Sequence, residues 1–216
     1  MNNNLDKIVR GIKDKKLLIF DFDGTIADTI DIEYDVYKKL LSHLGKKMTK
    51  PQWKKLLASH TAEGYLNLTN EMFGLKIGYD EFVDMYANAC REVEKIYPPR
   101  LFEWVKPFFK KVANKQKMML TNKDGNLIRE NLAMLGMNEE FPCVLSCTTL
   151  HTTKEECYPN ILIQFGVKPS ECVIFEDTQR YIDVGKSMEF TMVGVAHKGN
   201  YGHISNVDYL VDTTKE

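Results

Sequence analysis

Two aspartates stand two residues apart, Asp21 and Asp23, directly after the short apolar run Lys16-Leu-Leu-Ile-Phe20. A continuous apolar run of this kind predicts a strand buried on both faces of a parallel sheet. In open α/β sheets, ligands bind beyond the carboxyl ends of the strands. Asp, Gly and Thr also favour turns, so a plain turn is the alternative. Two neighbouring carboxylates repel each other and lose solvation, however, and this cost favours a site that uses them for a cation or a reaction.

The segment around these aspartates, Leu18-Ile-Phe-Asp-Phe-Asp-Gly-Thr-Ile-Ala-Asp-Thr29, resembles the first motif of the haloacid dehalogenase superfamily of phosphotransferases. The resemblance implies three later signatures in a fixed order, each at the end of a strand. All three are present, as Met119-Leu-Thr-Asn122, as Lys154 eight residues after Ser146, and as Val173-Ile-Phe-Glu-Asp-Thr178. Four motifs in the right order are far more specific than any one of them.

The two aspartates of the first motif would carry the covalent chemistry. In the family, one oxygen of the residue matching Asp21 attacks phosphorus while the other binds a metal ion. The residue matching Asp23 gives its backbone carbonyl to the metal. Its side chain first protonates the leaving oxygen and then takes a proton from the water that hydrolyses the aspartyl phosphate. Because the nucleophile and a phosphate monoester are both anions, a cation is needed to screen their repulsion.

The later motifs would hold the phosphate and that cation. The resemblance implies that Thr121 and Asn122 donate hydrogen bonds to phosphoryl oxygens, and that Lys154 places a positive charge beside the nucleophile. Glu176 and Asp177 would join the aspartates in binding Mg²⁺, an ion that prefers oxygen ligands. Simpler interpretations exist, because Thr121 and Asn122 could be a strand end and a turn, and Lys154 a solvated surface charge.

The resemblance implies a Mg²⁺-dependent phosphatase that acts on a small phosphorylated metabolite through an aspartyl-phosphate intermediate. Asp23 favours a phosphate ester as substrate, because the dehalogenases of the superfamily lack an acid at that position. The alternative is a sugar-phosphate mutase similar to β-phosphoglucomutase. That branch typically has a histidine twelve residues after its nucleophile, where this chain has Glu33, so water is the expected acceptor. A binding or regulatory protein without turnover is a further alternative, which the intact set of acids disfavours.

The elements that position these residues are predicted from apolar runs. After the first run, comparable runs lie at 117–121, 143–146, 172–175, 191–195 and 209–211, and they alternate with helical patterns. This order predicts a doubly wound, Rossmann-like parallel sheet of the α/β class. About ninety residues without a strand signal separate the first two runs, which is too long for an ordinary crossover. Apolar residues at helical spacing predict an all-helical insertion there.

We therefore expect an α/β core domain of residues 1–28 and 99–216 and an inserted helical domain of residues 29–98. The position and helical character of the insertion resemble the small cap of the phosphoglycolate phosphatase and β-phosphoglucomutase branch of the superfamily. Such caps close over the site, exclude water during phosphoryl transfer and contact the substrate. A helical lid suits a small molecule better than a folded protein.

Composition excludes several other classes. The chain is 44% hydrophobic and 27% charged, as globular proteins are, and its formal net charge of -1 offers no overall field for nucleic acid or an anionic membrane. No run approaches the roughly 18 apolar residues of a membrane span. Five cysteines without a Cys-x-x-Cys pair favour a reducing compartment, so we expect a cytoplasmic protein. The sequence leaves the oligomeric state open, and a monomer is compatible with it.

Overall fold

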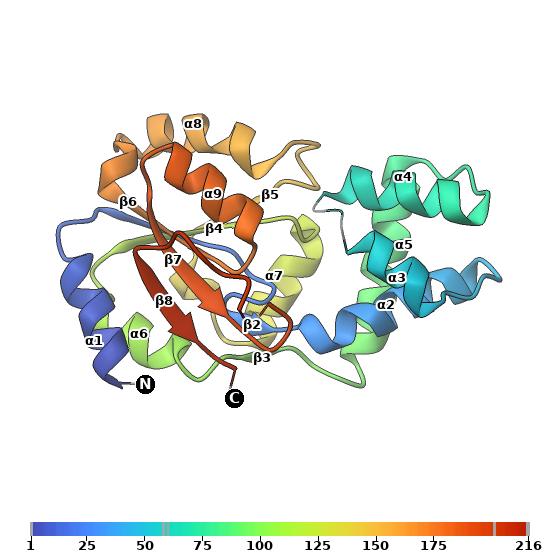
Figure 1. Ribbon diagram of the computed structural model, residues 1–216, viewed down its shortest axis with the longest axis horizontal. Coiled ribbons are helices and arrows are strands. Elements are labelled where there is room, and N and C mark those ends of the chain that lie inside the picture. The colour runs from blue at the N-terminus through green and yellow to red at the C-terminus, as the bar shows by residue number, and fades with distance from the viewer. Residues whose placement is uncertain (1, 58, 60, 201, 215–216) are drawn as a thin grey trace.

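A six-stranded sheet forms the centre of the computed structural model, which describes residues 2–57, 59, 61–200 and 202–214 (Figure 1). The strand order is β5-β4-β1-β6-β7-β8, and every neighbouring pair is parallel. The strands are β1 (Leu17–Phe20), β4 (Gln116–Thr121), β5 (Cys143–Ser146), β6 (Cys172–Glu176), β7 (Thr191–Ala196) and β8 (Tyr209–Asp212). Each predicted apolar run therefore forms a strand, and the doubly wound α/β class is confirmed.

Helices cover both faces of this sheet because successive side chains of a strand point to opposite faces. Leu18 and Phe20 of β1 belong to one apolar cluster, and Leu17 and Ile19 belong to another. The first cluster is closed by α1 (Asn2–Gly11), α6 (Val105–Lys111) and α7 (Gly125–Met134), and the second by α8 (Lys154–Phe165) and α9 (Gln179–Ser187). Short 3-10 turns at Asn138–Glu140 and Pro169–Glu171 precede β5 and β6.

The first apolar cluster is rich in aromatic rings and reaches the carboxyl end of β1. Phe20 stacks on Phe175 of β6 with 4.4 Å between ring centroids. Trp104 and Phe108 pack against Phe175 from the α6 side, so these aromatic side chains form part of the core. Because Phe20 and Phe175 directly precede Asp21 and Glu176, this packing fixes the backbone where the site begins.

Helix α1 is an element that the sequence analysis did not predict. Leu5, Ile8 and Ile12 lie on its buried side and within the turn that follows it, and each is at most 2% exposed. Polar Asn2 to Asn4 and charged neighbours surround these three residues in the sequence, so the apolar stripe is narrow. The helix is stabilised by packing on the sheet rather than by a strong pattern of its own.

Four helices between residues 30 and 94 lie beside the core, and we call this group the cap (Figure 1). They are α2 (Ile30–His43), α3 (Lys50–Leu56), α4 (Ala62–Phe73) and α5 (Tyr79–Glu94). The cap has its own apolar cluster, which includes Tyr37, Leu40 and Phe82. Thr49 and Gln52 form a capping box that starts α3, in which each residue's side chain accepts the other's backbone N–H.

The chain enters and leaves the cap through two short strands, β2 (Ala27–Asp28) and β3 (Arg100–Leu101), which pair antiparallel. Strands of two residues are too short to leave an apolar pattern, so the sequence analysis missed them. Helix α5 adds contacts at both ends. The Tyr79 hydroxyl donates to the carbonyl of Thr148 at 3.0 Å, and Arg91 forms a bidentate pair with Glu130 of α7. The cap is thereby held beside the carboxyl ends of the strands.

Within the described ranges, no helix has both the length and the apolar character needed to cross a membrane. The cysteines at positions 90, 143, 147, 157 and 172 are free thiols in the structure.

Candidate active site

The carboxyl ends of β1, β4 and β6 meet at one edge of the sheet and bring predicted site residues together. Phe20 is level with Met119 of β4 and with Phe175 of β6. Asp21, Thr121 and Glu176 each lie one or two residues after these paired positions, so they are close together at the carboxyl ends of their strands. The backbone N–H of Asp21 donates to the carbonyl of Phe175 at 3.1 Å, which extends the sheet ladder into the site. The three residues are 8%, 1% and 1% exposed, so the parallel register buries polar groups side by side.

Lys154 joins two of these carboxylates. It is the first residue of α8, whose start is fixed by a capping box between Thr153 and Glu156. The Nζ atom of Lys154 lies 2.8 Å from Oδ1 of Asp21 and 2.7 Å from Oε2 of Glu176, and the side chain is 2% exposed. Burial acts to lower the pKa of Lys154, but the two carboxylates outweigh it and raise that pKa well above its usual value. Lys154 is therefore a buried cation rather than a solvated surface charge.

Asp21, Glu176 and Asp177 form a carboxylate cluster with a deficit of positive charge. Oxygen atoms of the three side chains lie within 4.8 Å of one another. Burial raises the pKa of Asp21 and of Glu176 to about 7, and it also raises the pKa of Asp177. The attraction of Lys154 offsets only part of this effect. A divalent cation would fill the deficit, and three closely spaced carboxylate groups are donors that fit Mg²⁺.

His197 and Asn200, in the loop after β7, hold Asp177 in place. Nε2 of His197 lies 2.9 Å from Oδ2 of Asp177. The N–H of Gly199 donates to Nδ1 of the same ring at 3.0 Å, which assigns the ring proton to Nε2 and makes it the donor to Asp177. Nδ2 of Asn200 donates to the backbone carbonyl of Asp177 at 2.7 Å. The sequence analysis missed both residues, because only the adjacency of β6 and β7 brings their loop to the site.

Asp23 is held by Thr29 and Lys123. The Thr29 hydroxyl donates to Oδ1 of Asp23 at 2.8 Å, and Nζ of Lys123 lies 3.2 Å from the same oxygen. Lys123 is 7% exposed and also lies 3.5 Å from Glu94, at the end of α5. Burial acts to lower the pKa of Lys123, but Asp23 and other neighbours raise it above its usual value. Lys123 was not predicted as a site residue from the sequence. The signal that could have identified it is its position directly after the Thr121-Asn122 motif.

Gly24 allows the first motif to approach the fourth. Its φ of +71° lies in a region that residues with a side chain rarely adopt. A Cβ atom at this position would stand 2.5 Å from Oδ2 of Asp177. The next residue, Thr25, directs its hydroxyl toward Oδ1 of Asp177 at 3.4 Å. The glycine of the motif is therefore required both for the turn and for the space beside Asp177.

Thr121 and Asn122 line the cavity next to the carboxylate cluster. Oγ1 of Thr121 accepts the N–H of Lys123 at 3.1 Å, so its own hydrogen can be donated to a ligand. The Asn122 amide donates to the hydroxyl of Tyr181 at 2.9 Å, and its backbone carbonyl accepts the Thr148 hydroxyl. All the site residues predicted from the sequence thus lie around one cavity, since Asp21, Asp23, Lys154, Glu176 and Asp177 also line it.

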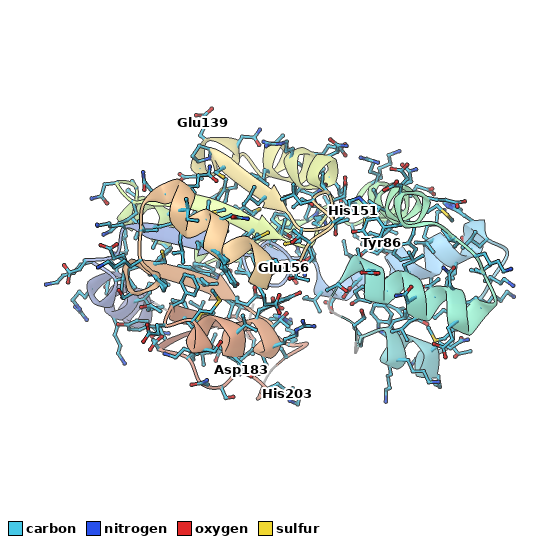
Figure 2. The ribbon with its side chains drawn as sticks, turned by 90° about the horizontal axis from the view of Figure 1, so that it is seen from above. Tyr86, Glu139, His151, Glu156, Asp183 and His203 are labelled. Carbon is cyan, nitrogen blue, oxygen red and sulfur yellow. The ribbon has the colours of Figure 1, made fainter. Side chains whose placement is uncertain are left out.

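This cavity has a volume of about 310 Å³ and lies between the core and the cap. On the cap side its wall includes Glu33 and Tyr65, together with apolar and aromatic residues of α2 and α5. In Figure 2, Tyr86 of α5 lies on the part of the cap that faces the core, and His151 lies on the core loop opposite. The volume suits a small molecule.

A family model described as haloacid dehalogenase-like hydrolase matches residues 18–195. A phosphoglycolate phosphatase from Psychrobacter arcticus is 26% identical over 202 residues, which cover 88% of this chain and 86% of the relative. A phosphorylated carbohydrates phosphatase from Thermotoga maritima is 24% identical over 192 residues, which cover 86% of this chain and 87% of the relative.

The fold is also similar to solved structures. The crystal structure of a β-phosphoglucomutase from Clostridium difficile matches with a TM-score of 0.67 and 20% identity, and the match covers 93% of this chain and 92% of the other. At this identity the likeness concerns the fold alone. The family model extends from β1 to β7 and includes every residue of the four motifs. The chain belongs to the haloacid dehalogenase-like hydrolases.

Proposed function

We propose that this protein is a Mg²⁺-dependent phosphatase that hydrolyses a phosphate ester of a small metabolite through an aspartyl-phosphate intermediate. The observation that carries the proposal is the contact between buried Lys154 and Asp21 in the wall of a small cavity. A permanent cation at this point attracts a phosphate to the carboxylate that would attack it. The names of the two phosphatase relatives support the same activity.

In the first step, a carboxylate oxygen of Asp21 attacks phosphorus and the bond from phosphorus to the alcohol oxygen breaks. Lys154 screens the repulsion between the two anions. The Thr121 hydroxyl and the Asn122 amide donate hydrogen bonds to phosphoryl oxygens, whose charge is redistributed as the bond breaks. These three groups come from β4, the loop after it and α8, so the sheet fixes their separation before the substrate binds.

Asp23 transfers the protons of both steps. It protonates the departing alcohol oxygen, and then takes a proton from the water that attacks the aspartyl phosphate. Thr29 and Lys123 both contact Oδ1 of Asp23, so we assign the proton transfer to Oδ2. In this arrangement Thr29 and Lys123 are positioning residues for Asp23.

The metal site consists of Asp21, Asp177 and Glu176, with the backbone carbonyl of Asp23. When bound, Mg²⁺ supplies positive charge that lowers the repulsion between the nucleophile and the phosphate. His197 and Asn200 orient Asp177 in this proposal through their hydrogen bonds to its side chain and backbone carbonyl. Glu176 accepts hydrogen bonds at both oxygens, from Lys154 and from the N–H of Thr178, whereas Lys154 contacts Oδ1 of Asp21, so we assign Oδ2 of Asp21 as a principal ligand in this proposal.

The cap acts as a lid in this proposal. We assign residues 29–98 to a cap domain and residues 1–28 and 99–216 to the catalytic core. The cap supplies one wall of the cavity and would limit access of water while the phosphate is transferred. The same wall would contact the part of the substrate that differs between phosphate esters.

A second candidate is a sugar-phosphate mutase, and one observation favours it. Glu33 occupies the sequence position at which the mutase branch typically has a histidine, and its carboxyl group lines the cavity. Burial raises the pKa of Glu33 to about 7, which is suitable for a group that exchanges protons with a sugar hydroxyl. A mutase would convert a sugar phosphate into its isomer without net release of inorganic phosphate.

The test is a panel of phosphate monoesters assayed with Mg²⁺ and with EDTA, with inorganic phosphate and sugar-phosphate isomers both measured. We expect Mg²⁺-dependent phosphate release that Asp21→Asn abolishes. The matched control is Asp183→Asn, because Asp183 is an exposed carboxylate on the outer side of α9 (Figure 2). Isomer without phosphate would favour the mutase. Wild-type turnover in Asp21→Asn would refute the proposed nucleophile.

A further inference from the structure

The two walls of the cavity differ in their supply of positive charge. The basic residues that line it, among those the structure describes, are Lys123 and Lys154, and both belong to the core. Lys154 contacts Asp21 and Glu176, and Lys123 contacts Asp23 and Glu94. Their positive charge is therefore already matched by carboxylates next to the proposed phosphate position. The cap wall offers no further cation within the described part of the chain.

The cap wall instead offers a carboxyl group among apolar side chains. Glu33 lies on α2, and its Oε1 atom is 3.5 Å from the hydroxyl of Tyr65 on α4. Residues of the same wall include Ile32, Val36 and Phe82. Burial raises the pKa of Glu33 to about 7, and the negative charges of Asp23 and Asp177 raise it further while Lys123 lowers it. Glu33 thus faces the carboxylates of the core across the cavity.

We propose that Glu33 selects phosphate esters by the charge of their alcohol part, excluding those with a second anionic group and favouring those that present a hydroxyl or ammonium group. This inference rests on the proposed phosphatase function. A second anion on the substrate would lie against Glu33 with no cation among the described residues of that wall to balance it, and like charges in an enclosed site repel strongly. A hydroxyl or ammonium group would donate a hydrogen bond to the Glu33 carboxylate. The apolar residues beside Glu33 would contact the carbon skeleton.

With this selectivity, the chain would differ in substrate from the relative named phosphoglycolate phosphatase. Phosphoglycolate carries a carboxylate two atoms from its phosphate ester oxygen, and a cavity suited to it would need a cation on the cap wall. Glu33 provides the opposite charge. We therefore expect phosphoglycolate to be a poor ligand of this protein, although a relative named phosphoglycolate phosphatase is 26% identical to it.

Three two-carbon esters test this, since they differ only in the terminal group: phosphoglycolate with a carboxylate, 2-hydroxyethyl phosphate with a hydroxyl, and phosphoethanolamine with an ammonium group. Each is measured at pH 8 with Mg²⁺ as a competitive inhibitor of hydrolysis of the best panel ester, so none needs to be turned over. For the wild type, we expect the inhibition constant of phosphoglycolate to be at least about tenfold higher than those of the other two, because of its repulsion by Glu33.

Glu33→Gln keeps the size of the side chain and removes its charge, so it should reduce this discrimination to about threefold or less. Asp35→Asn is the matched control. Asp35 lies on the same helix, pairs with Lys38 at the surface and has a 44% exposed side chain, so this variant should keep the wild-type discrimination.

The inference is overturned if phosphoglycolate binds the wild type as tightly as 2-hydroxyethyl phosphate, or if Glu33→Gln leaves the ratio of inhibition constants unchanged. A wild-type protein that hydrolyses no ester of the panel would instead overturn the proposed function, and the assignment of Glu33 with it.

Discussion

Replacing Lys154 by methionine tests whether the burial of an ion pair, rather than its length, determines its contribution to stability. Nζ of Lys154 lies 2.7 Å from Oε2 of Glu176, and Nζ of Lys16 lies 2.6 Å from Oε1 of Glu171. The two contacts are nearly equal in distance but differ in exposure. The side chains of the first pair are 2% exposed, whereas Lys16 and Glu171 are 59% and 29% exposed.

Removing one partner of a buried pair costs about 3–5 kcal/mol, because the other charge remains buried without compensation. Lys154→Met leaves both Asp21 and Glu176 in that state, so we expect the upper end of this range. In a chain of this length, a decrease of about 5 kcal/mol in the free energy of unfolding lowers Tm by roughly 10–20 °C. Water screens the surface pair, so Lys16→Met should leave Tm close to that of the wild type.

The variants are compared by thermal and urea unfolding at pH 8 with EDTA, so that no divalent cation replaces the missing charge. The double variant Lys154→Met, Glu176→Gln should recover part of the lost stability, since the second substitution removes one of the uncompensated charges. Equal losses in the Lys154 and Lys16 variants would refute the reasoning. So would a double variant no more stable than Lys154→Met alone.

Two further predictions concern the metal site. Burial raises the pKa of Asp21 from 3.8 to about 7. Between about pH 4 and 7 the native state therefore binds more protons than the unfolded chain. The free energy of unfolding of the metal-free protein should thus fall as the pH rises. Mg²⁺ relieves this cost only when the carboxylate is ionised, so its effect on Tm should be larger at pH 8 than at pH 5; equal effects would contradict the assignment. His197→Ala should weaken Mg²⁺ binding by about 10–100-fold in calorimetric titration, because Asp177 loses its orienting donor. Exposed His203 serves as the control (Figure 2), and unchanged affinity in His197→Ala would exclude the positioning role.

The sequence was sufficient to predict the sheet and the residues at its edge. A strand buried on both faces requires a continuous apolar run, so the buried strands β1, β4, β6 and β7 were visible without any structure. The less buried β5 and β8 also left short apolar runs. The residues next to these runs, such as Asp21 and Glu176, could be placed at one edge because parallel strands align their carboxyl ends. Their assembly around one cavity followed from topology, whereas their catalytic roles remain proposals.

Other features could not be predicted because they depend on contacts between distant segments. His197 reaches Asp177 only because β7 pairs with β6, and Lys123 meets Glu94 only because α5 returns toward the core. Neither contact leaves a spacing pattern in the chain. Glu33 is the most informative case. Its difference from the mutase pattern was visible, but its position in the cavity depends on how the cap packs beside the core.

The charge deficit of the site connects its stability with its selectivity. Burying Asp21, Glu176 and Asp177 around Lys154 makes the metal-free core less stable, and the same excess of negative charge would attract the divalent cation that we propose. Once the cation and Lys154 are both present, the core wall can accept the phosphate. The cap wall does not share these positive charges, because Glu33 faces them across the cavity and accepts a hydrogen bond from the Tyr65 hydroxyl at 3.5 Å. In the proposed reaction, one wall therefore suits an anion and the other rejects a second anion, which would let a near-neutral chain distinguish the two ends of its substrate.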